Sequence, residues 1–284
     1  MPANNKIICV CGAGTMGAGI AQAAALHGYQ VKLYDLNAIV LENSRELIEK
    51  NLQGLVDKGK MSSAEKTDVT GNLQWESDSR QCTADIIIEA IVEKLPEKIA
   101  LFQLMAAVHG PSAVYASNTS SLAIASIAAA HPFPNRMAGM HFFNPATIMK
   151  LVEVVETTVT DAETIQVLVQ LGKDLGKVPV VCKDSPGFIV NRVARPYYIE
   201  SLRLAEEGVA IPVIDALLAA AGFKMGPFRL MDLIGNDINY AVSCGVYEQL
   251  GEPGRLKPSF IQQQKVAQGK LGRKSGAGYY TYNK

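Results

Sequence analysis

A glycine-rich turn near the start of the sequence constrains the fold more than any other feature. The apolar segment 6–11 leads directly into Gly12-Ala-Gly14-Thr-Met-Gly17, and a helical pattern follows at once. In such a strand–turn–helix unit the first glycine permits a tight turn, the second leaves room for a phosphate, and the third lets helix and strand pack closely. The sequence therefore predicts a doubly wound α/β domain that holds a dinucleotide on a helix N-terminus, through Gly12, Gly14, Thr15, Met16 and Gly17.

An acidic residue at the end of the second apolar segment narrows the choice of dinucleotide. Asp35 ends the segment 30–35, about 20 residues beyond the glycines, where a carboxylate accepts hydrogen bonds from ribose hydroxyls. Leu36 and Asn37 follow it, and neither could neutralise a 2′-phosphate. The cofactor expected is therefore NAD rather than NADP. The alternative is a glycine-rich turn that only caps a buried helix, with Asp35 simply ending a strand.

The chain changes its pattern near residue 185. Before that point, short apolar segments alternate with helical ones, which is typical of a parallel sheet covered by helices. Strands are expected at 6–11, 30–35, 84–90, 113–117, 137–143, 151–155 and 178–182, and helices at 16–27, 38–58, 96–108, 124–130 and 162–175. After it only helices are expected, at 187–207, 212–221, 229–250 and 258–268. We predict a Rossmann-type domain over residues 1–185 and an all-helical domain over 186–284, whose first helix has Ser185 as N-cap and Pro186 as its first residue.

The composition excludes several classes of protein. Lys and Arg number 27, as do Asp and Glu, so no global charge would attract nucleic acid or an anionic membrane. The five cysteines are an odd number without regular spacing, which disfavours disulfides, and none has the histidine neighbours of a metal site. We expect no signal peptide, and no apolar run in the sequence reaches about 18 residues. We expect a cytoplasmic protein without a metal.

One of the four histidines differs from the others. His27, His109 and His131 each close a helical segment, where histidine commonly caps carbonyl groups. His141 instead lies at the carboxyl end of a predicted strand, the edge at which open α/β sheets bind ligands. If the chain reverses as a hairpin centred on Thr147, Glu153 lies directly opposite and could orient the imidazole as a general base. The alternative is a buried His–Glu pair retained for stability.

Two further polar segments are candidates for the same site. Ser117-Asn-Thr-Ser-Ser121 follows another apolar strand, and a hydroxyl there could bind a reacting oxygen. Spacing does not choose between Ser120 and Ser121, and either could instead start the next helix. Asn191, near the start of the helical domain, could face the site or be an ordinary helix residue.

Taken together, these motifs resemble those of the short-chain L-3-hydroxyacyl-CoA dehydrogenases. The resemblance rests on Gly12–Gly17 with Asp35, Ser117–Leu122, His141–Pro145, Lys150–Glu153 and Pro186–Arg192, and it extends to Gly276-Ala-Gly-Tyr-Tyr. It implies NAD-dependent interconversion of an (S)-3-hydroxyacyl-CoA and a 3-ketoacyl-CoA, with 3-hydroxybutyryl-CoA and acetoacetyl-CoA as the expected pair. It also implies a homodimer formed through the helical domain, whose apolar segments 213–221 and 228–234 exceed what one site would use.

The resemblance implies a role for each matching residue. His141 would be the catalytic base, Glu153 would orient it, Ser120 would contact the substrate oxygen, and Asn191 would belong to the active site. The implied cofactor contacts are Glu93, Lys98, Ser120, Asn144 and Lys274, and the implied substrate contacts are Asn51 and Lys58 on the helix after Asp35. Lys50, Lys58 and Lys60 form a basic cluster suited to the phosphates of coenzyme A, although a solvated helix face is the alternative.

Two other functions remain open from the sequence. A dehydrogenase of free 3-hydroxy acids would use a lysine base on the first helix of the second domain, but the segment 187–192 contains no lysine. A non-catalytic dinucleotide-binding protein, either a redox sensor or a structural relative, would leave His141, Glu153, Ser120 and Asn191 without a purpose. Turnover of an acyl-CoA would separate these two functions from the expected one.

Overall fold

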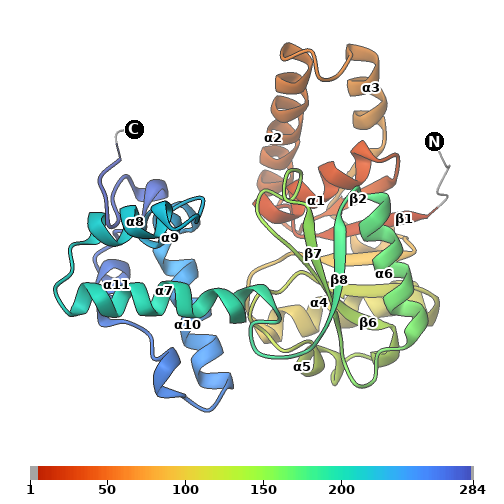
Figure 1. Cartoon of the computed structure of the whole chain (residues 1–284). Helices are drawn as coiled ribbons and strands as arrows, with labels where there is room; N and C mark the ends of the chain where they lie inside the picture. Colours follow the sequence, from red (N-terminus) through yellow and green to blue (C-terminus); the bar gives the residue numbers. More distant parts are fainter. Residues whose placement is uncertain (1–5, 283–284) are drawn as a thin grey trace. The chain divides into compact units, whose positions relative to one another are not determined.

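The computed structural model describes residues 6–282, so the N-terminal residues 1–5, where we expected no targeting signal, lie outside the described part. The chain divides into two compact units, Met1–Asp184 and Ser185–Lys284. Figure 1 labels many of their elements.

The first unit is built on one eight-stranded sheet with the order β3-β2-β1-β4-β5-β6-β7-β8. Neighbouring strands are parallel except β6 and β7, which pair antiparallel. The central strands are buried on both faces, as apolar strands covered by helices must be. The strands are β1 Ile7–Cys11, β2 Gln30–Tyr34, β3 Leu73–Glu76, β4 Ile86–Glu89, β5 Val114–Ser117, β6 Met137–Phe142, β7 Leu151–Glu156 and β8 Val178–Lys183.

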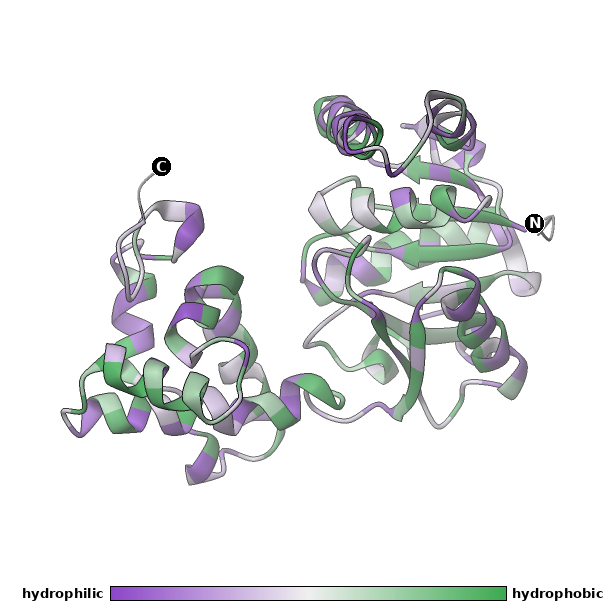
Figure 2. Cartoon of the chain, turned by 45° about the horizontal axis from the view of Figure 1, so that its top comes forward, coloured by the Kyte–Doolittle hydropathy of each residue, from purple (hydrophilic) through white to green (hydrophobic). Residues whose placement is uncertain are grey.

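Helices cover this sheet, and the apolar core lies between the helices and the strands. Small side chains allow α1 to bury eight of its residues close to the sheet, so the strands and α1 form one apolar core. Figure 2 shows the strands largely apolar, whereas polar and apolar residues are mixed in α2 and α3. The α-helices of this unit are α1 Thr15–Leu26, α2 Ala38–Asp57, α3 Ser63–Gly71, α4 Leu95–His109, α5 Ile124–Ala128 and α6 Ala162–Asp174.

Two elements of this unit, α3 and β3, were not predicted from the sequence. A capping box starts α3, because the Ser62 hydroxyl accepts from the backbone N–H of Glu65 and the Glu65 carboxylate accepts from that of Ser62. Lys66 of α3 donates to Gln53 of α2 at 2.8 Å, and the two helices lie side by side in Figure 1. The other strands and helices of this unit lie close to their predicted positions, and the predicted Rossmann-type architecture is confirmed.

The second unit is helical, as predicted, and Phe228 and Met231 are fully buried in one of its core clusters. Its α-helices are α7 Val190–Glu206, α8 Ile211–Ala220, α9 Pro227–Ile234, α10 Asn236–Gln249 and α11 Phe260–Ala267. One long helix over 229–250 was wrong, because Gly235, with φ +107°, separates α9 from α10.

The predicted start of the first helix in this unit was also wrong. Ser185 is not an N-cap and Pro186 is not helical, since the helix begins only at Val190. Gly187 and Phe188 have φ values of +72° and +50°, which a right-handed helix cannot contain. Instead, the backbone N–H of Phe188 donates to the Ser185 carbonyl at 2.8 Å and closes a turn.

Candidate active site

The glycine-rich turn connects β1 to α1 and leaves space where a phosphate would lie. Gly12 has φ +99°, and a Cβ on Gly17 would overlap the carbonyl oxygen of Gly12. A Cβ on Gly14, the N-cap residue of α1, would have no heavy atom within 4 Å. Packing therefore requires glycine at position 17, whereas the open space at Gly14 lies at the N-terminus of α1. This arrangement fits the pyrophosphate of a dinucleotide.

Asp35, directly after β2, holds the turn in place. Its Oδ2 accepts from the backbone N–H of Ala13 at 2.9 Å, and its Oδ1 accepts from that of Asn37 at the same distance. Each carboxylate oxygen can accept more than one hydrogen bond, so the residue can still bind ribose hydroxyls. The half-buried Asp35 thus joins the end of β2 to the glycine turn.

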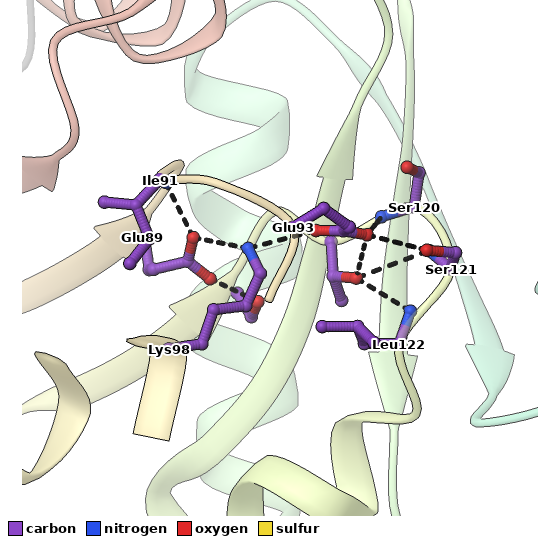
Figure 3. A network of polar contacts seen from close by, with 9 residues as sticks. Glu89, Ile91, Glu93, Lys98, Ser120, Ser121 and Leu122 are labelled. Carbon is purple, nitrogen blue, oxygen red and sulfur yellow. Dashed lines mark hydrogen bonds and ion pairs between the residues drawn. The ribbon is translucent and has the colours of Figure 1, made fainter. Parts of the chain in front are cut away.

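The segment after β5 is organised around one carboxylate, that of Glu93 (Figure 3). Its Oε1 accepts from the Thr119 hydroxyl at 2.6 Å, from the backbone N–H groups of Ser120 and Ser121 at 3.0 and 3.1 Å, and from the Ser121 hydroxyl at 2.9 Å. The Ser120 side chain points away from Glu93 in Figure 3, whereas the Ser121 hydroxyl points toward it. The two serines therefore differ in orientation, which their spacing could not show.

Neither Ser120 nor Ser121 is the helix N-cap that the sequence left as an alternative. The next helix, α5, has Ala123 as its N-cap residue, without a side-chain cap of its own. The carboxylate of Asp184 accepts instead from the backbone N–H groups of Ile124 and Ala125, at 3.1 and 2.7 Å. Sequence reasoning missed this role of Asp184 because the residue lies about 60 positions away from the helix.

A buried ion pair between Lys98 and Glu89 contacts Glu93 on its second carboxylate oxygen. Lys98 is 1% exposed, and its Nζ donates to Glu89 Oε1 at 2.5 Å and lies 3.1 Å from Glu93 Oε2. Glu89, the last residue of β4, is fully buried, and it also accepts from the Ser117 hydroxyl at 2.6 Å and from the Ile91 N–H at 2.7 Å. The structure thus places Lys98 in the interior between two carboxylates. Sequence reasoning did not single out Glu89, although a glutamate that ends an apolar strand was a signal for it.

The two carboxylates respond differently to this environment. Burial raises the pKa of Glu89, and the nearby Lys98 and its hydrogen bonds only partly offset this effect. Burial acts in the same direction on Glu93, but Lys98 and the donors from Thr119 and Ser120 outweigh it, so the pKa of Glu93 is lowered. Glu93 is therefore held as an anion at the surface of the network.

His141 and Glu153 form a pair across β6 and β7. The register places them directly opposite, as the hairpin predicted, and His141 Nδ1 lies 2.7 Å from Glu153 Oε2. His141 is 6% exposed and Glu153 is 1% exposed. Because Nδ1–H donates to the carboxylate, the neutral ring carries its lone pair on Nε2. The geometry is that of an imidazole oriented by a carboxylate.

The carboxyl ends of β4, β5 and β6 bring these groups to the same edge of the sheet. Glu89 pairs with Ser117, and Ser117 with Gly139, two residues before His141. Asn118 Oδ1 accepts from the backbone N–H of Phe142 at 2.8 Å, and so ties the serine segment to the histidine strand. Asn118 is a further positioning residue that sequence reasoning missed. Asn144, expected to contact the cofactor, is exposed just beyond β6.

The residues expected to contact coenzyme A lie on or just after α2. Asn51 is exposed, and its Nδ2 donates to Gln22 of α1 at 3.1 Å. Lys50, Lys58 and Lys60 are exposed, with Lys58 as the C-cap residue of α2. These side chains belong to the part of the first unit that extends away from the sheet (Figure 1).

The two remaining candidates lie in the second unit. Asn191 is in the first turn of α7, and its carbonyl accepts from the buried Arg195 side chain at 3.0 Å. Lys274 Nζ lies 2.7 Å from the Asp237 carboxylate. Within residues 6–282, no group of three His, Cys, Asp or Glu side chains could hold a metal ion, and no helix is long and apolar enough to cross a membrane.

A doubly wound sheet with an open glycine turn and an acidic residue directly after β2 is the architecture of a domain that binds NAD. Residues 7–185 match the family model "3-hydroxyacyl-CoA dehydrogenase, NAD binding domain", and residues 187–282 match "3-hydroxyacyl-CoA dehydrogenase, C-terminal domain". The chain belongs to the 3-hydroxyacyl-CoA dehydrogenase family.

Individual relatives agree with this assignment. The chain is 47% identical over 285 residues to 3-hydroxyadipyl-CoA dehydrogenase of Escherichia coli, covering 99% of this chain but only 60% of that protein. It is 42% identical to the mitochondrial hydroxyacyl-coenzyme A dehydrogenase of Rattus norvegicus, covering 98% of this chain and 91% of that protein. Among solved structures, 3-hydroxybutyryl-CoA dehydrogenase from Escherichia coli matches with a TM-score of 0.94 and 48% identity, over 98% of this chain and 59% of that one.

Proposed function

We propose that the protein interconverts an (S)-3-hydroxyacyl-CoA and the corresponding 3-ketoacyl-CoA with NAD, and that 3-hydroxybutyryl-CoA and acetoacetyl-CoA are its substrates. The observation that carries this proposal is the His141–Glu153 pair, with a distance of 2.7 Å, at the sheet edge where the NAD-binding turn lies. The names of the relatives support an acyl-CoA substrate, and one of them supports the four-carbon acyl chain.

In the proposed mechanism, His141 Nε2 removes the hydroxyl proton of the substrate. Glu153 holds the ring in the tautomer that leaves Nε2 unprotonated, and its charge stabilises the imidazolium that forms. Ser120 donates a hydrogen bond to the reacting oxygen, in line with the orientation of its side chain away from Glu93. Asn191 is proposed to position the thioester. In the reverse direction His141 returns the proton to the oxygen.

When bound, the cofactor would supply the redox chemistry, since its oxidised form accepts a hydride and its reduced form donates one. We propose that the glycine turn with Thr15 and Met16 holds the pyrophosphate, and that Asp35 holds the adenosine ribose. Glu93, Ser120, Asn144 and Lys274 are the remaining proposed contacts of the cofactor. The burial of Lys98 indicates that it acts on the cofactor through Glu93 rather than by direct contact.

His141→Ala tests the proposed function. A positioned general base contributes about 10²–10⁴-fold, so kcat with acetoacetyl-CoA should fall by at least about 100-fold while the affinity for NADH is retained. Turnover near that of the unmodified protein would remove His141 from the mechanism.

The choice of substrate needs a second comparison. Consumption of NADH is compared for acetoacetyl-CoA, longer 3-ketoacyl-CoA thioesters and free acetoacetate. Preference for the free acid would contradict the proposal, and tight NADH binding without turnover of any acyl-CoA would favour a non-catalytic role. A clear preference for a longer chain would correct only the four-carbon substrate.

The second unit is proposed to form a homodimer. Val213 and Leu217 of α8 are 57% and 64% exposed, and Leu233 and Ile234 of α9 are 48% and 38% exposed. Apolar side chains grouped in this way commonly mark a subunit contact. Light scattering should therefore give twice the 30.5 kDa of one chain, and a monomer mass would contradict the proposal.

A further inference from the structure

The ionic network of Glu89, Lys98 and Glu93 has an uneven charge count. Lys98 is the only cation within 4.0 Å of either carboxylate in the described part of the chain, and it is shared between them, at 2.5 Å from Glu89 and 3.1 Å from Glu93. With both carboxylates ionised, these two groups and one ammonium leave one net negative charge. Because Glu89 and Lys98 are almost completely buried, water screens this charge far less than a charge at the surface.

The network also lies beside the cofactor turn. Glu89 Oε1 accepts from the backbone N–H of Ile91, and a Cβ on Gly12 would meet both the Ala90 carbonyl and the Ile91 side chain. In a doubly wound sheet the dinucleotide crosses the carboxyl edge, with its pyrophosphate on the first turn. Since Asp35 marks the adenosine side at β2, the nicotinamide half belongs on the other side, above β4 and β5. Glu89 ends β4, and Ser117, which donates to it, ends β5.

The two redox forms of the cofactor differ by one charge at this half. The oxidised nicotinamide ring is a cation and the reduced ring is neutral, so a fixed negative charge nearby favours the oxidised form. We propose that Glu89 is a specificity-determining residue, whose buried charge gives the network its net negative charge and shifts cofactor binding toward NAD⁺ relative to NADH. This proposal rests on the cofactor placement of the proposed function and on no acyl-CoA chemistry.

Glu89→Gln is the variant that tests the charge with least disturbance. The glutamine carbonyl can still accept from Ile91 and Lys98, and its amide can donate to the Ser117 hydroxyl, which then acts as acceptor. What remains is a neutral Lys98–Glu93 pair. A unit charge acting across roughly 10 Å at an effective dielectric constant of about 35 changes a binding ratio about fivefold.

The measurement is the ratio of two dissociation constants, without any acyl-CoA. NADH binding is followed by its fluorescence, and NAD⁺ binding by competition with NADH. We expect the ratio Kd(NAD⁺)/Kd(NADH) to rise about fivefold in Glu89→Gln, the factor expected for one unit charge. Glu97→Gln is the matched control, because Glu97 precedes Lys98 on α4 but is exposed, and its Oε1 lies 3.9 Å from Lys94 Nζ. Its ratio should stay within about twofold of the unmodified protein, as expected for a solvent-screened charge.

Two further variants keep the test decisive. Ser117→Ala removes a hydrogen bond to Glu89 without removing charge, so it should leave the ratio unchanged even if both affinities fall. If Glu89→Gln does not fold, Glu93→Gln makes the same change in net charge and must raise the ratio in the same direction. A ratio within about twofold of the unmodified protein in the charge-removing variant overturns the proposal, whether or not both affinities drop together. A protein that binds both cofactor forms but turns over no acyl-CoA would contradict the proposed function and leave this test valid.

Discussion

Replacing Glu153 by glutamine tests most directly whether the buried carboxylate works on His141 through its charge. Glutamine has nearly the same size, and Glu153 is 1% exposed, so the substitution leaves the packing between β6 and β7 almost unchanged. It removes the negative charge 2.7 Å from His141 Nδ1. The amide oxygen can still accept from Nδ1–H, and the neutral ground state of the pair therefore survives.

The expected magnitude follows from what happens when His141 accepts a proton. At that moment the contact with Glu153 becomes a hydrogen bond between two charged groups, whereas glutamine offers only a neutral one. Buried hydrogen bonds to charged groups contribute about 1.5–3 kcal/mol. Because the neutral hydrogen bond to glutamine retains about 1 kcal/mol, the loss in the transition state is roughly 1–2 kcal/mol, which corresponds to a fall in kcat of about 5- to 30-fold.

The assay is steady-state consumption of NADH with acetoacetyl-CoA, with NADH affinity and thermal unfolding measured on the same samples. Glu156→Gln is the matched control on the same strand, because Glu156 is the last residue of β7 and its Oε1 lies 2.6 Å from Lys183 Nζ near the surface. We expect Glu156→Gln to keep its turnover. If Glu153→Gln keeps kcat within about threefold, less than the loss of any charged hydrogen bond should cost, the charge-based argument is refuted. An equal loss in both variants would refute its specificity.

Three further predictions concern the turn, a buried histidine and a helix cap. Gly17→Ala should lower the melting temperature, because its Cβ would overlap the Gly12 carbonyl, whereas Gly14→Ala should fold normally but bind NADH more weakly, because its Cβ enters the open space. Burial lowers the pKa of His131 below 6.5, so its contribution to stability is complete above pH 6.5 and is lost as the pH falls through the lowered value. Urea unfolding at roughly pH 7.5 and 5.5 should therefore show a smaller loss of stability in His131→Asn than in the unmodified protein. Asp184→Ala removes the carboxylate that caps α5 and should cost about 1 kcal/mol in urea unfolding.

The segments whose structure could be predicted are those in which apolar residues follow a clear pattern. The central strands are continuous apolar runs between turns, so β1, β4 and β6 lie within two residues of their expected ends. The segment 63–76 was missed because it buries only Val69 and Leu73, and periodicity cannot detect so narrow an apolar face. Only the Ser62–Glu65 capping box could have indicated α3.

The same distinction applies to the candidate site. A contact within one hairpin could be predicted from the sequence, whereas a contact that depends on the tertiary fold could not. The pairing of His141 with Glu153 was predictable because a hairpin fixes its register by symmetry about the turn. The contact between Lys98 and Glu89 was not, because it joins the end of a strand to the first turn of a helix across an irregular loop. The start of α7 was misplaced for a similar reason. Ser185-Pro186 is a good helix start by composition, but Gly187 and Phe188 adopt left-handed conformations there.

The buried carboxylates at this edge of the sheet illustrate why the balanced overall charge of the chain says little about its chemistry. Glu89 and Glu93 share the ammonium group of Lys98, so each of these carboxylates has its cationic partner before any ligand arrives. Glu153 instead faces an imidazole, which becomes a cation only when it accepts a proton. Fixed charges of the first kind preorganise a site, whereas the second arrangement favours the protonated state of the base as it forms. We therefore propose different roles for the two kinds of carboxylate, and we expect substitutions at Glu89 to change cofactor preference and those at Glu153 to change turnover.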